Sequence, residues 1–323
     1  MKSTRENYIH EIKISDIAFP NNVWLAPMAG VSGKALRSFV KMFGAGCTFT
    51  EMVSLEGIMR GNKKTLQYLD IREEENTIIQ LFGKCEPDKF YKAGKILQQR
   101  CGAKIVDINF GCPVRKVVRS GAGSALLKTP QSMKDIVKAL KDSGLFVSAK
   151  IRSGFDSVNI EETIPALDDS GADMIILHPR LAIQFYNGSA DWNLIKAARK
   201  LTRKVLIASG DVKTPEDAEE LFKSTNPDGI MIGRQATGSP FLFKQILDHF
   251  QNGSYNGYSL EEIKGIMLEF SELFIKIEKR DSIKPIRTIL IQYVRNYQNS
   301  REIRHRISLI DTIDELKEIL KSW

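Results

Sequence analysis

The sequence predicts an α/β protein, a TIM (β/α)8 barrel followed by a small all-α helical bundle domain. The first two thirds of the chain alternate short β-rich runs with helical stretches, and eight such units in about 245 residues fit a TIM barrel. Most of the runs are continuously apolar, as in parallel strands that are covered on both faces. No strand–GxGxxG–helix unit opens the chain, which argues against an open, doubly wound sheet.

The elements follow from these patterns in chain order. The expected strands are Val23–Ala26, Cys47–Thr50, Thr77–Leu81, Ile105–Asn109, Val147–Ile151, Met174–Leu177, Val205–Ala208 and Gly229–Ile232. The expected helices are Lys34–Phe43, Pro87–Arg100, Gln131–Lys141, Ile160–Ser170, Trp192–Leu201 and Pro215–Lys223. Cap signals such as Thr129-Pro130 and Thr214-Pro215 begin several helices, whereas Ser54–Leu69 is less regular.

The pattern changes near residue 250, where residues 251–257 are polar and Gly-rich, as in a linker. Ser259 and Glu262 then form a capping box. Apolar residues recur at steps of three and four from Ile263 to Ile277, which predicts an amphipathic helix. We therefore expect a barrel domain over residues 1–250 and a helical domain over residues 251–323.

The charge of the chain favours a polyanionic partner. Lys and Arg exceed Asp and Glu by 47 − 39 = +8. The stretch Lys276–Arg306 alone holds nine Lys and Arg against three acidic residues, with Tyr293, Tyr297 and His305 interleaved. A solvated helix face is the simpler interpretation of one such run. Together with the global charge, the run predicts a surface for a nucleic-acid backbone.

The sequence also predicts the compartment. Residues 1–14 are charged and contain no apolar signal segment, and no uncharged stretch is long and apolar enough to cross a membrane. The four cysteines, Cys47, Cys85, Cys101 and Cys112, include no C-x-x-C pair. We expect a cytoplasmic protein, a monomer with no metal and no membrane partner.

Active sites of TIM barrels lie at the carboxyl ends of the strands, and three features there are informative. Ser209-Gly210-Asp211 and Gly233-Arg234 follow the last two strands, where backbone N–H groups commonly bind a phosphate. The simpler alternative is that these glycines only turn strands into helices. Lys150 ends an apolar strand and should meet an anion. A Schiff-base lysine and a structural ion pair are the alternatives.

Cys112 stands in Asn-Phe-Gly-Cys-Pro, directly after a buried strand. A lone cysteine is more often a small apolar core residue than a catalyst. Its place at the functional end of the barrel, before a long Gly-rich loop, favours catalysis. The other three cysteines keep the structural interpretation.

The chain resembles the tRNA-dihydrouridine synthases in motifs that cover nearly the whole barrel. They are Leu25–Gly30, Thr50–Met52, Gln80–Gly83, Asp107–Pro113 with Lys116-Val117 and Gly121–Gly123, Lys150–Arg152, His178, Ala190–Trp192, Ser209–Asp211 and Ile232–Arg234. Two departures stand out. Pro179-Arg180-Leu181 replaces a small residue followed by Arg-Thr, so a hydroxyl is missing, and Ser209 replaces a usual Asn.

The resemblance implies an FMN enzyme that uses NADPH to reduce the C5–C6 bond of a uridine in tRNA. It implies that Cys112 is the catalytic proton donor. The implied cofactor-binding residues are Ala26, Pro27, Met28, Gln80, Lys150, His178, Ser209, Gly210, Asp211, Gly233 and Arg234. The expected substrate-binding residues are Asn109, Lys116, Arg119, Arg180, Arg295, Arg301 and Arg304.

Two other functions stay open at this point. A dihydroorotate-dehydrogenase-like FMN oxidoreductase would share the barrel but would need no basic bundle. A non-catalytic RNA-binding barrel would need neither Cys112 nor Lys150. The sequence selects neither the modified uridine, nor tRNA over ribosomal RNA, nor NADPH over NADH.

Overall fold

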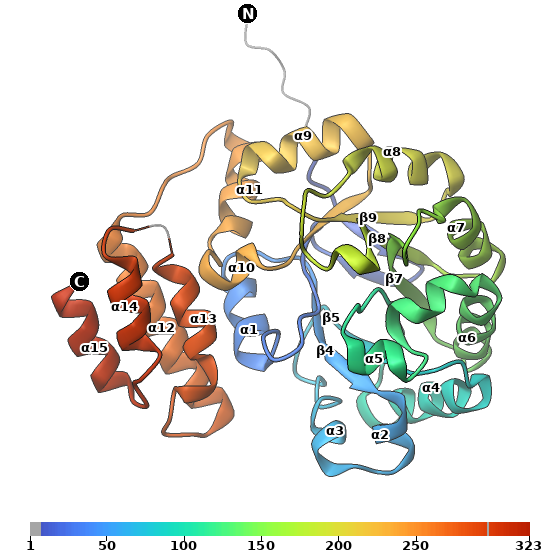
Figure 1. Ribbon diagram of the computed structural model, residues 1–323, viewed down its shortest axis with the longest axis horizontal. Helices are drawn as coiled ribbons and strands as arrows, with labels where there is room; N and C mark the ends of the chain where they lie inside the picture. The colour runs from blue at the N-terminus through green and yellow to red at the C-terminus, as the bar shows by residue number, and fades with distance from the viewer. Residues whose placement is uncertain (1–7, 296) are drawn as a thin grey trace, which may run out of the picture.

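The computed structural model of the chain describes residues 8–295 and 297–323. Residues 1–7, which the sequence analysis placed in the barrel domain and in the N-terminus without a signal segment, lie outside the described residues. Eight parallel strands form the barrel (Figure 1). They are β3 (Val23–Leu25), β4 (Thr48–Ser54), β5 (Thr77–Phe82), β6 (Ile105–Phe110), β7 (Phe146–Gly154), β8 (Met174–Leu181), β9 (Val205–Ser209) and β10 (Gly229–Ile232).

The strands lie in the order β3-β10-β9-β8-β7-β6-β5-β4, with every neighbouring pair parallel. The ring closes between β3 and the start of β4, where the Leu25 N–H donates to the Cys47 carbonyl at 2.9 Å. The Gly46 N–H donates to the Val23 carbonyl at 3.0 Å beside it. The predicted TIM barrel is therefore confirmed, strand by strand.

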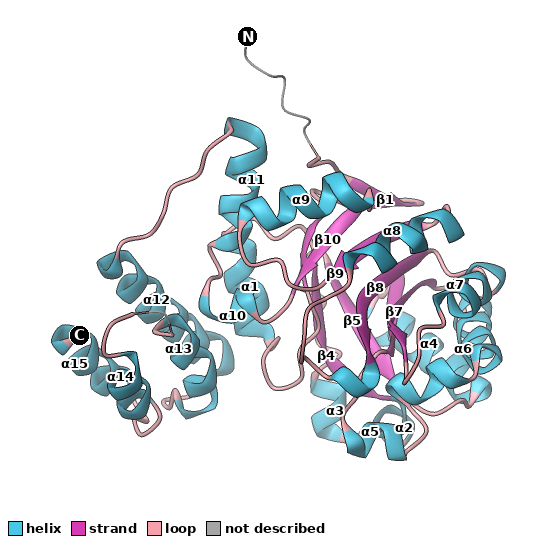
Figure 2. Cartoon of the chain, turned by 45° about the horizontal axis from the view of Figure 1, so that its top comes forward, coloured by secondary structure: helices cyan, strands magenta, loops and turns pink. Residues whose placement is uncertain are grey.

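Helices surround the strands (Figure 2). The longer ones are α1 (Lys34–Met42), α4 (Pro87–Cys101), α6 (Pro130–Asp142), α7 (Ile160–Asp169), α8 (Trp192–Leu201), α9 (Pro215–Thr225) and α11 (Leu242–Asn252). The shorter ones are α2 (Leu55–Met59), α3 (Lys63–Gln67), α5 (Arg115–Arg119), η1 (Gly123–Lys128), η2 (Ala182–Gln184) and α10 (Gln235–Gly238). All six predicted helices are confirmed, and the less regular Ser54–Leu69 holds α2 and α3.

A small hairpin that the sequence did not predict closes the amino-terminal end of the barrel. Its strands are β1 (Ile12–Ile14) and β2 (Ile17–Phe19). Phe19 packs on Trp24 inside the barrel, with 5.0 Å between ring centroids, and joins an apolar cluster at the start of the strands. Because this end is filled, the opposite end is left for a site.

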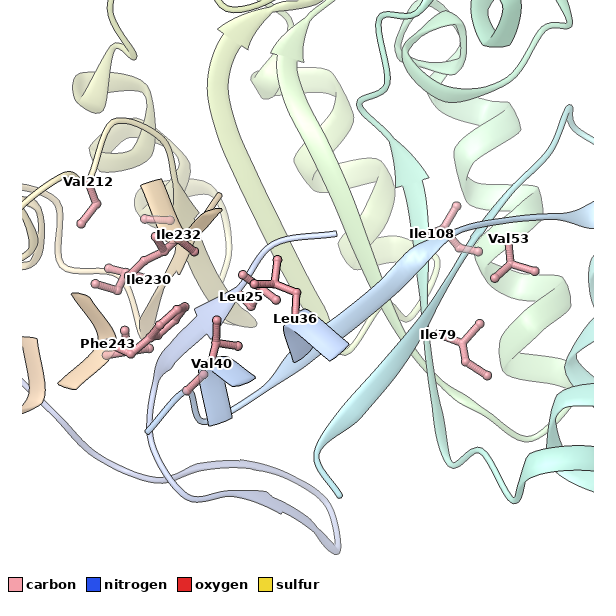
Figure 3. Close-up of a cluster of buried hydrophobic side chains, with 14 of the residues drawn as sticks. Leu25, Leu36, Val40, Val53, Ile79, Ile108, Val212, Ile230, Ile232 and Phe243 are labelled. Atoms are coloured by element: carbon pink, nitrogen blue, oxygen red, sulfur yellow. The ribbon is translucent and has the colours of Figure 1, made fainter. Parts of the chain in front are cut away.

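A second apolar layer lies between the strands and the surrounding helices. Leu36 and Val40 of α1 and Phe243 of α11 gather there with Leu25 and Ile230 of the sheet (Figure 3). These side chains are at most 1% exposed. Each buried aliphatic or aromatic side chain of this kind contributes about 1.5–3 kcal/mol to folding, so the layer holds the strand ends in fixed positions.

The bundle packs directly against the barrel. It consists of α12 (Leu260–Glu278), η3 (Lys284–Ile286), α13 (Arg287–Tyr293), α14 (Ser300–Ile307) and α15 (Ile313–Ser322). The predicted capping box is present, with Ser259 and Glu262 bonded reciprocally. Phe270 of α12 lies 5.2 Å from Phe39 of α1, measured between ring centroids. A Cβ on Gly238 of α10 would lie 2.7 Å from the backbone of Gln292 in α13, so only glycine allows this close approach.

Candidate active site

A cavity of about 850 Å³ lies at the carboxyl ends of the barrel strands. This volume is within the range of small-molecule and cofactor sites. Ten of the eleven expected cofactor-binding residues line it, namely Ala26, Pro27, Met28, Lys150, His178, Ser209, Gly210, Asp211, Gly233 and Arg234. Its outer wall comes from the bundle, through residues of α12 and α13 and through Arg295. The bundle therefore forms part of the wall at the mouth of the barrel. The sequence did not predict this contact, because it shows only a linker between the two domains.

Most of the other expected residues lie around the cavity and are not part of the wall that the described residues form. Gln80 is fully buried and Asn109 is 8% exposed, both below the mouth on β5 and β6. Lys116 and Arg119 are exposed on α5, which follows β6. Arg301 and Arg304 lie on α14 of the bundle. Arg180 and Arg295 are the two expected substrate-binding residues that line the cavity.

Lys150 is half-buried at the cavity wall. Within residues 8–295 and 297–323, no carboxylate lies close enough to its ammonium group to form an ion pair. Burial and, to a smaller extent, the Arg152 charge lower the pKa of Lys150 to about 8, against the opposing effect of Asp107. The structural ion pair considered for Lys150 is therefore wrong, and an anionic ligand in the cavity would stabilise its charge.

The loop after β9 is built around Gly210 and Asp211. A Cβ on Gly210 would lie 3.1 Å from both Ala190 and the His178 ring, and Gly210 has a φ of 137°. The Asp211 carboxylate accepts two hydrogen bonds from Arg180, at 2.9 and 2.7 Å, and one from the Ala190 N–H at 2.7 Å. The carboxylate is thus occupied by the protein.

Unlike the Asp211 carboxylate, two backbone N–H groups of the loops after β9 and β10 are not bonded to described residues. No acceptor among the described residues pairs with the backbone N–H groups of Gly210 or Gly233. Both residues line the cavity beside the Arg234 side chain, which is 57% exposed. This combination of free N–H groups and a guanidinium suits a phosphate.

Arg180 also fixes the state of His178. Its Nη1 lies 3.2 Å from His178 Nε2. Because a guanidinium only donates, Nε2 accepts and the ring proton is on Nδ1. Burial lowers the pKa of His178 well below 6.5, and the positive charges of Lys150, Arg152, Arg180 and Arg234 lower it further. His178 therefore faces the cavity as a neutral ring with one N–H donor.

Cys112 is 9% exposed and packs against Val117 and Ala122 of the following loop. Its N–H donates to Asn109 Oδ1 at 2.8 Å. Gly123, with a φ of 60°, allows that loop to pass over Cys112, because a Cβ there would lie 2.9 Å from the Cys112 carbonyl oxygen. Burial raises the pKa of Cys112, so the sulfur is held as a thiol at neutral pH, as a proton donor requires.

Sequence reasoning missed three residues here. Tyr186, which is 52% exposed, lines the cavity with its ring 4.3 Å from the Arg234 guanidinium. Arg152 is 3% exposed and donates to the carbonyls of Gly111 and Leu181. Asp107 is fully buried in β6. Asp107 and Arg152 lie within motifs that carry the resemblance but had no assigned role, and the signal for Tyr186 was the aromatic pair at 185–186 in a polar loop.

Three arginines of the bundle, Arg295, Arg301 and Arg304, do not pair with its acids. Arg295 and Arg301 are exposed and Arg304 is half-buried, and none of the three forms an ion pair with any described residue. Asp311 pairs with Arg287 and Asp314 with Lys317, while Glu315 caps α15 through Thr312. These acids therefore do not neutralise the three arginines.

Two searches of the described residues bear on other partners. No group of three or more His, Cys, Asp or Glu side chains in them could hold a metal ion. None of the helices found in the described part of the chain is both long enough and apolar enough to cross a membrane.

Comparisons with known proteins agree on one family. The family model for dihydrouridine synthase matches residues 24–322. A "Probable tRNA-dihydrouridine synthase" of Aquifex aeolicus is 35% identical over 309 residues, covering 92% of this chain and 96% of that protein. The "tRNA-dihydrouridine synthase B" of Pectobacterium carotovorum is 31% identical over 316 residues, covering 96% and 98%.

Solved structures share the barrel at low sequence identity. The old yellow enzyme from Trypanosoma cruzi has a TM-score of 0.58 at 10% identity and covers 81% of this chain and 96% of that chain. Histamine dehydrogenase from Rhizobium sp. 4-9 has a TM-score of 0.59 at 13% identity and covers 83% and 51%. At these identities the likeness establishes the fold alone.

Proposed function

The chain belongs to the dihydrouridine synthase family, and from this premise we propose that it reduces a uridine of tRNA to 5,6-dihydrouridine, with FMN as its cofactor and NADPH as the reductant. The observation that carries the proposal is the cavity, where the Lys150 ammonium group, which forms no ion pair with a described residue, and two loops whose N–H groups have no acceptor among the described residues line one space. Cys112 is not part of the cavity wall, but it lies in the loop directly after β6, near enough to Lys150 of the wall for their charges to interact.

The residues present fit a phosphorylated flavin. The free N–H groups of Gly210 and Gly233, together with Arg234, suit its phosphate. Ala26, Pro27 and Met28 offer a backbone wall for a flat ring. Lys150 stabilises negative charge on the reduced ring, and His178 Nδ1–H donates a hydrogen bond into the cavity. When bound and reduced by NADPH, the flavin would supply the hydride that adds to C6 of the uracil ring.

Three expected cofactor residues take indirect roles in the proposal. Asp211 holds Arg180 and the loop at Ala190, so it shapes the phosphate loop from outside. Ser209 ends β9 and places Gly210. Gln80 is buried with its amide bonded to Asp107 and Asn109, and it supports the cavity floor through these bonds.

Cys112 donates the proton that C5 of the uracil requires. Its buried thiol is protonated at neutral pH, and it is positioned through the hydrogen bond from its N–H to Asn109. Asn109 is the candidate to orient the uracil edge beside it. A positioned general acid of this kind accelerates a reaction by about 10²–10⁴-fold.

A base in folded RNA must leave its stack to reach such a cavity, and the surrounding backbone must be held while it does so. We assign that grip to cations around the mouth: Lys116 and Arg119 on α5, and Arg295, Arg301 and Arg304 at the bundle. Arg180, which is 2% exposed and bonded to Asp211 and His178, organises the site from beneath instead.

The experiment is to map dihydrouridine in all RNA from cells with and without this gene. We expect one tRNA position or a small set of positions to lose dihydrouridine, and plasmid-borne wild-type protein to restore it. Loss of dihydrouridine confined to ribosomal RNA would mean that the substrate is ribosomal RNA and not tRNA. The proposal would be overturned if the deletion strain kept dihydrouridine at every position and the purified protein bound no FMN.

A further inference from the structure

A fully buried carboxylate, Asp107, lies one layer below the active-site residues and has no part in the proposed reaction. Strand register shows the two layers. Gln80, Asp107 and Ser148 form one row across β5, β6 and β7. Asn109 and Lys150, two residues further along β6 and β7, are paired in the next row toward the cavity.

Two hydrogen bonds hold the Asp107 carboxylate. The Ser148 hydroxyl donates to Oδ1 and Gln80 Nε2 donates to Oδ2 at 2.6 Å. No cation of the described chain lies within ion-pair distance of it. Removing a carboxylate from water costs several kcal/mol. A group retained at that cost needs a reason beyond packing.

When it is ionised, the Asp107 carboxylate only accepts hydrogen bonds, and it then sets the direction of a chain of hydrogen bonds. With Nε2 of Gln80 directed to Asp107, Gln80 Oε1 accepts from Asn109 Nδ2 at 2.9 Å. Asn109 Oδ1 is then free to accept from the N–H groups of Gly111 and Cys112, at 3.1 and 2.8 Å. The orientation of two amides and the anchoring of the Cys112 loop thus follow from one side chain.

The charges around Lys150 show a second consequence. Arg152 on its own strand, Arg180 after His178 on β8 and Arg234 after β10 all place positive charge around the cavity. The Asp211 carboxylate is taken by Arg180. Cys112 and His178 are neutral at pH 7, which leaves Asp107 as the carboxylate that supports the Lys150 charge.

We propose that Asp107 is a positioning residue for this site: its carboxylate keeps Lys150 in the ammonium form and fixes the direction of the Gln80–Asn109 chain that anchors the Cys112 loop. The importance of Lys150 to a flavin rests on the proposed function. The interaction between Asp107 and Lys150 is a property of the apoprotein and can be measured without FMN.

Asp107→Asn isolates the charge. The asparagine oxygen can still accept from Gln80 while its Nδ2 donates to the Ser148 hydroxyl, so the hydrogen-bond direction is kept and one negative charge is lost. Ser153→Ala is the matched control on the same strand, because the buried Ser153 hydroxyl has no hydrogen-bond partner among the described residues.

The readout is the rate at which an amine-reactive acetylating reagent modifies Lys150 in apoprotein at pH 7.5, where Asp107 is mainly ionised, followed by peptide mass spectrometry. With the pKa of Lys150 at about 8, a loss of one pKa unit raises its unprotonated fraction at this pH, and its labelling rate, roughly threefold. We expect this increase in Asp107→Asn and the wild-type rate in Ser153→Ala. Equal rates in wild type and Asp107→Asn would overturn the proposal.

Ser148→Ala tests the same idea if Asp107→Asn does not fold. Removing one donor from the carboxylate weakens its ionised form, so Lys150 labels faster, by a smaller factor than in Asp107→Asn. An unchanged or slower rate would again overturn the proposal. Neither measurement uses FMN or RNA, so a negative result leaves the proposed reaction to its own test.

Discussion

The barrel mouth and the helical bundle both concentrate positive charge, but they hold it in opposite ways. At the mouth, Arg152 and Arg180 are 3% and 2% exposed, and each donates to several protein acceptors. In the bundle, Arg295 and Arg301 are exposed and pair with no described acid. Buried charge is costly and requires fixed geometry, whereas exposed charge acts through a field that salt screens. The comparison assigns chemistry to the mouth and RNA attraction to the bundle.

The largest effect should come from the mouth. Cys112→Ala should lower turnover of RNA uridine by roughly 10²–10⁴-fold, because a positioned acid is lost. FMN content and FMN reduction by NADPH should not change, which absorbance spectroscopy measures. Cys101→Ala is the control, because that sulfur donates to the Leu97 carbonyl within α4. Normal turnover in Cys112→Ala would mean that another group supplies the proton.

The next effect compares one ion pair from each region. Asp211→Ala leaves the buried Arg180 charge unpaired, which should cost roughly 3–5 kcal/mol. Asp314→Ala removes an exposed pair with Lys317, at 3.4 Å, and should cost about 0–1 kcal/mol. Thermal unfolding at pH 7 measures both. Similar melting temperatures for the two variants would contradict the distinction between buried and exposed charge.

A third prediction concerns the bundle alone. Arg301→Glu with Arg304→Glu should weaken tRNA binding and reduce the slope of log K against log salt by roughly 2, about one per lost phosphate contact. The melting temperature should hold, since neither arginine pairs with a described acid. Arg295 is left out because it lines the cavity. A lower melting temperature with an unchanged salt slope would mean that these residues of α14 contribute to stability and not to RNA binding.

The smallest effect is the pH dependence of stability at Asp107. Burial raises the pKa of Asp107 from 3.8 to about 7. The folded state therefore binds this proton more tightly than the unfolded state, and stability is lost as pH rises through 7. Asp107→Asn should raise the melting temperature at pH 8 by a few degrees, roughly 2–4 °C per kcal/mol, and less at pH 5. A lower melting temperature at pH 8 would contradict this sign.

Most of the barrel could be predicted from the sequence, because its strands and helices are indicated by local residue patterns. Runs such as Val147–Ile151 are continuously apolar, and the residues that follow each strand must lie at one end of a barrel. The hairpin β1–β2 was missed because each of its strands has three residues, too few to show a period.

Pairings between distant residues were not predictable. Arg180 and Asp211 are bonded across 31 positions, and Phe270 of the bundle packs on Phe39 of the barrel. Neither partner carries a local signal of the other. For the same reason the resemblance placed Asp211 and Gln80 among the cofactor-binding residues, without the protein contacts that occupy both side chains.

The most direct test separates binding from chemistry in one assay. With FMN-loaded protein, NADPH and unmodified tRNA, kcat and KM for dihydrouridine formation would be measured for wild type, Cys112→Ala and the Arg301→Glu, Arg304→Glu variant. The account predicts that the bundle variant keeps kcat within about twofold and raises KM, while Cys112→Ala loses kcat. A bundle variant with normal KM and a strongly reduced kcat would contradict the division between a catalytic mouth and an RNA-attracting bundle.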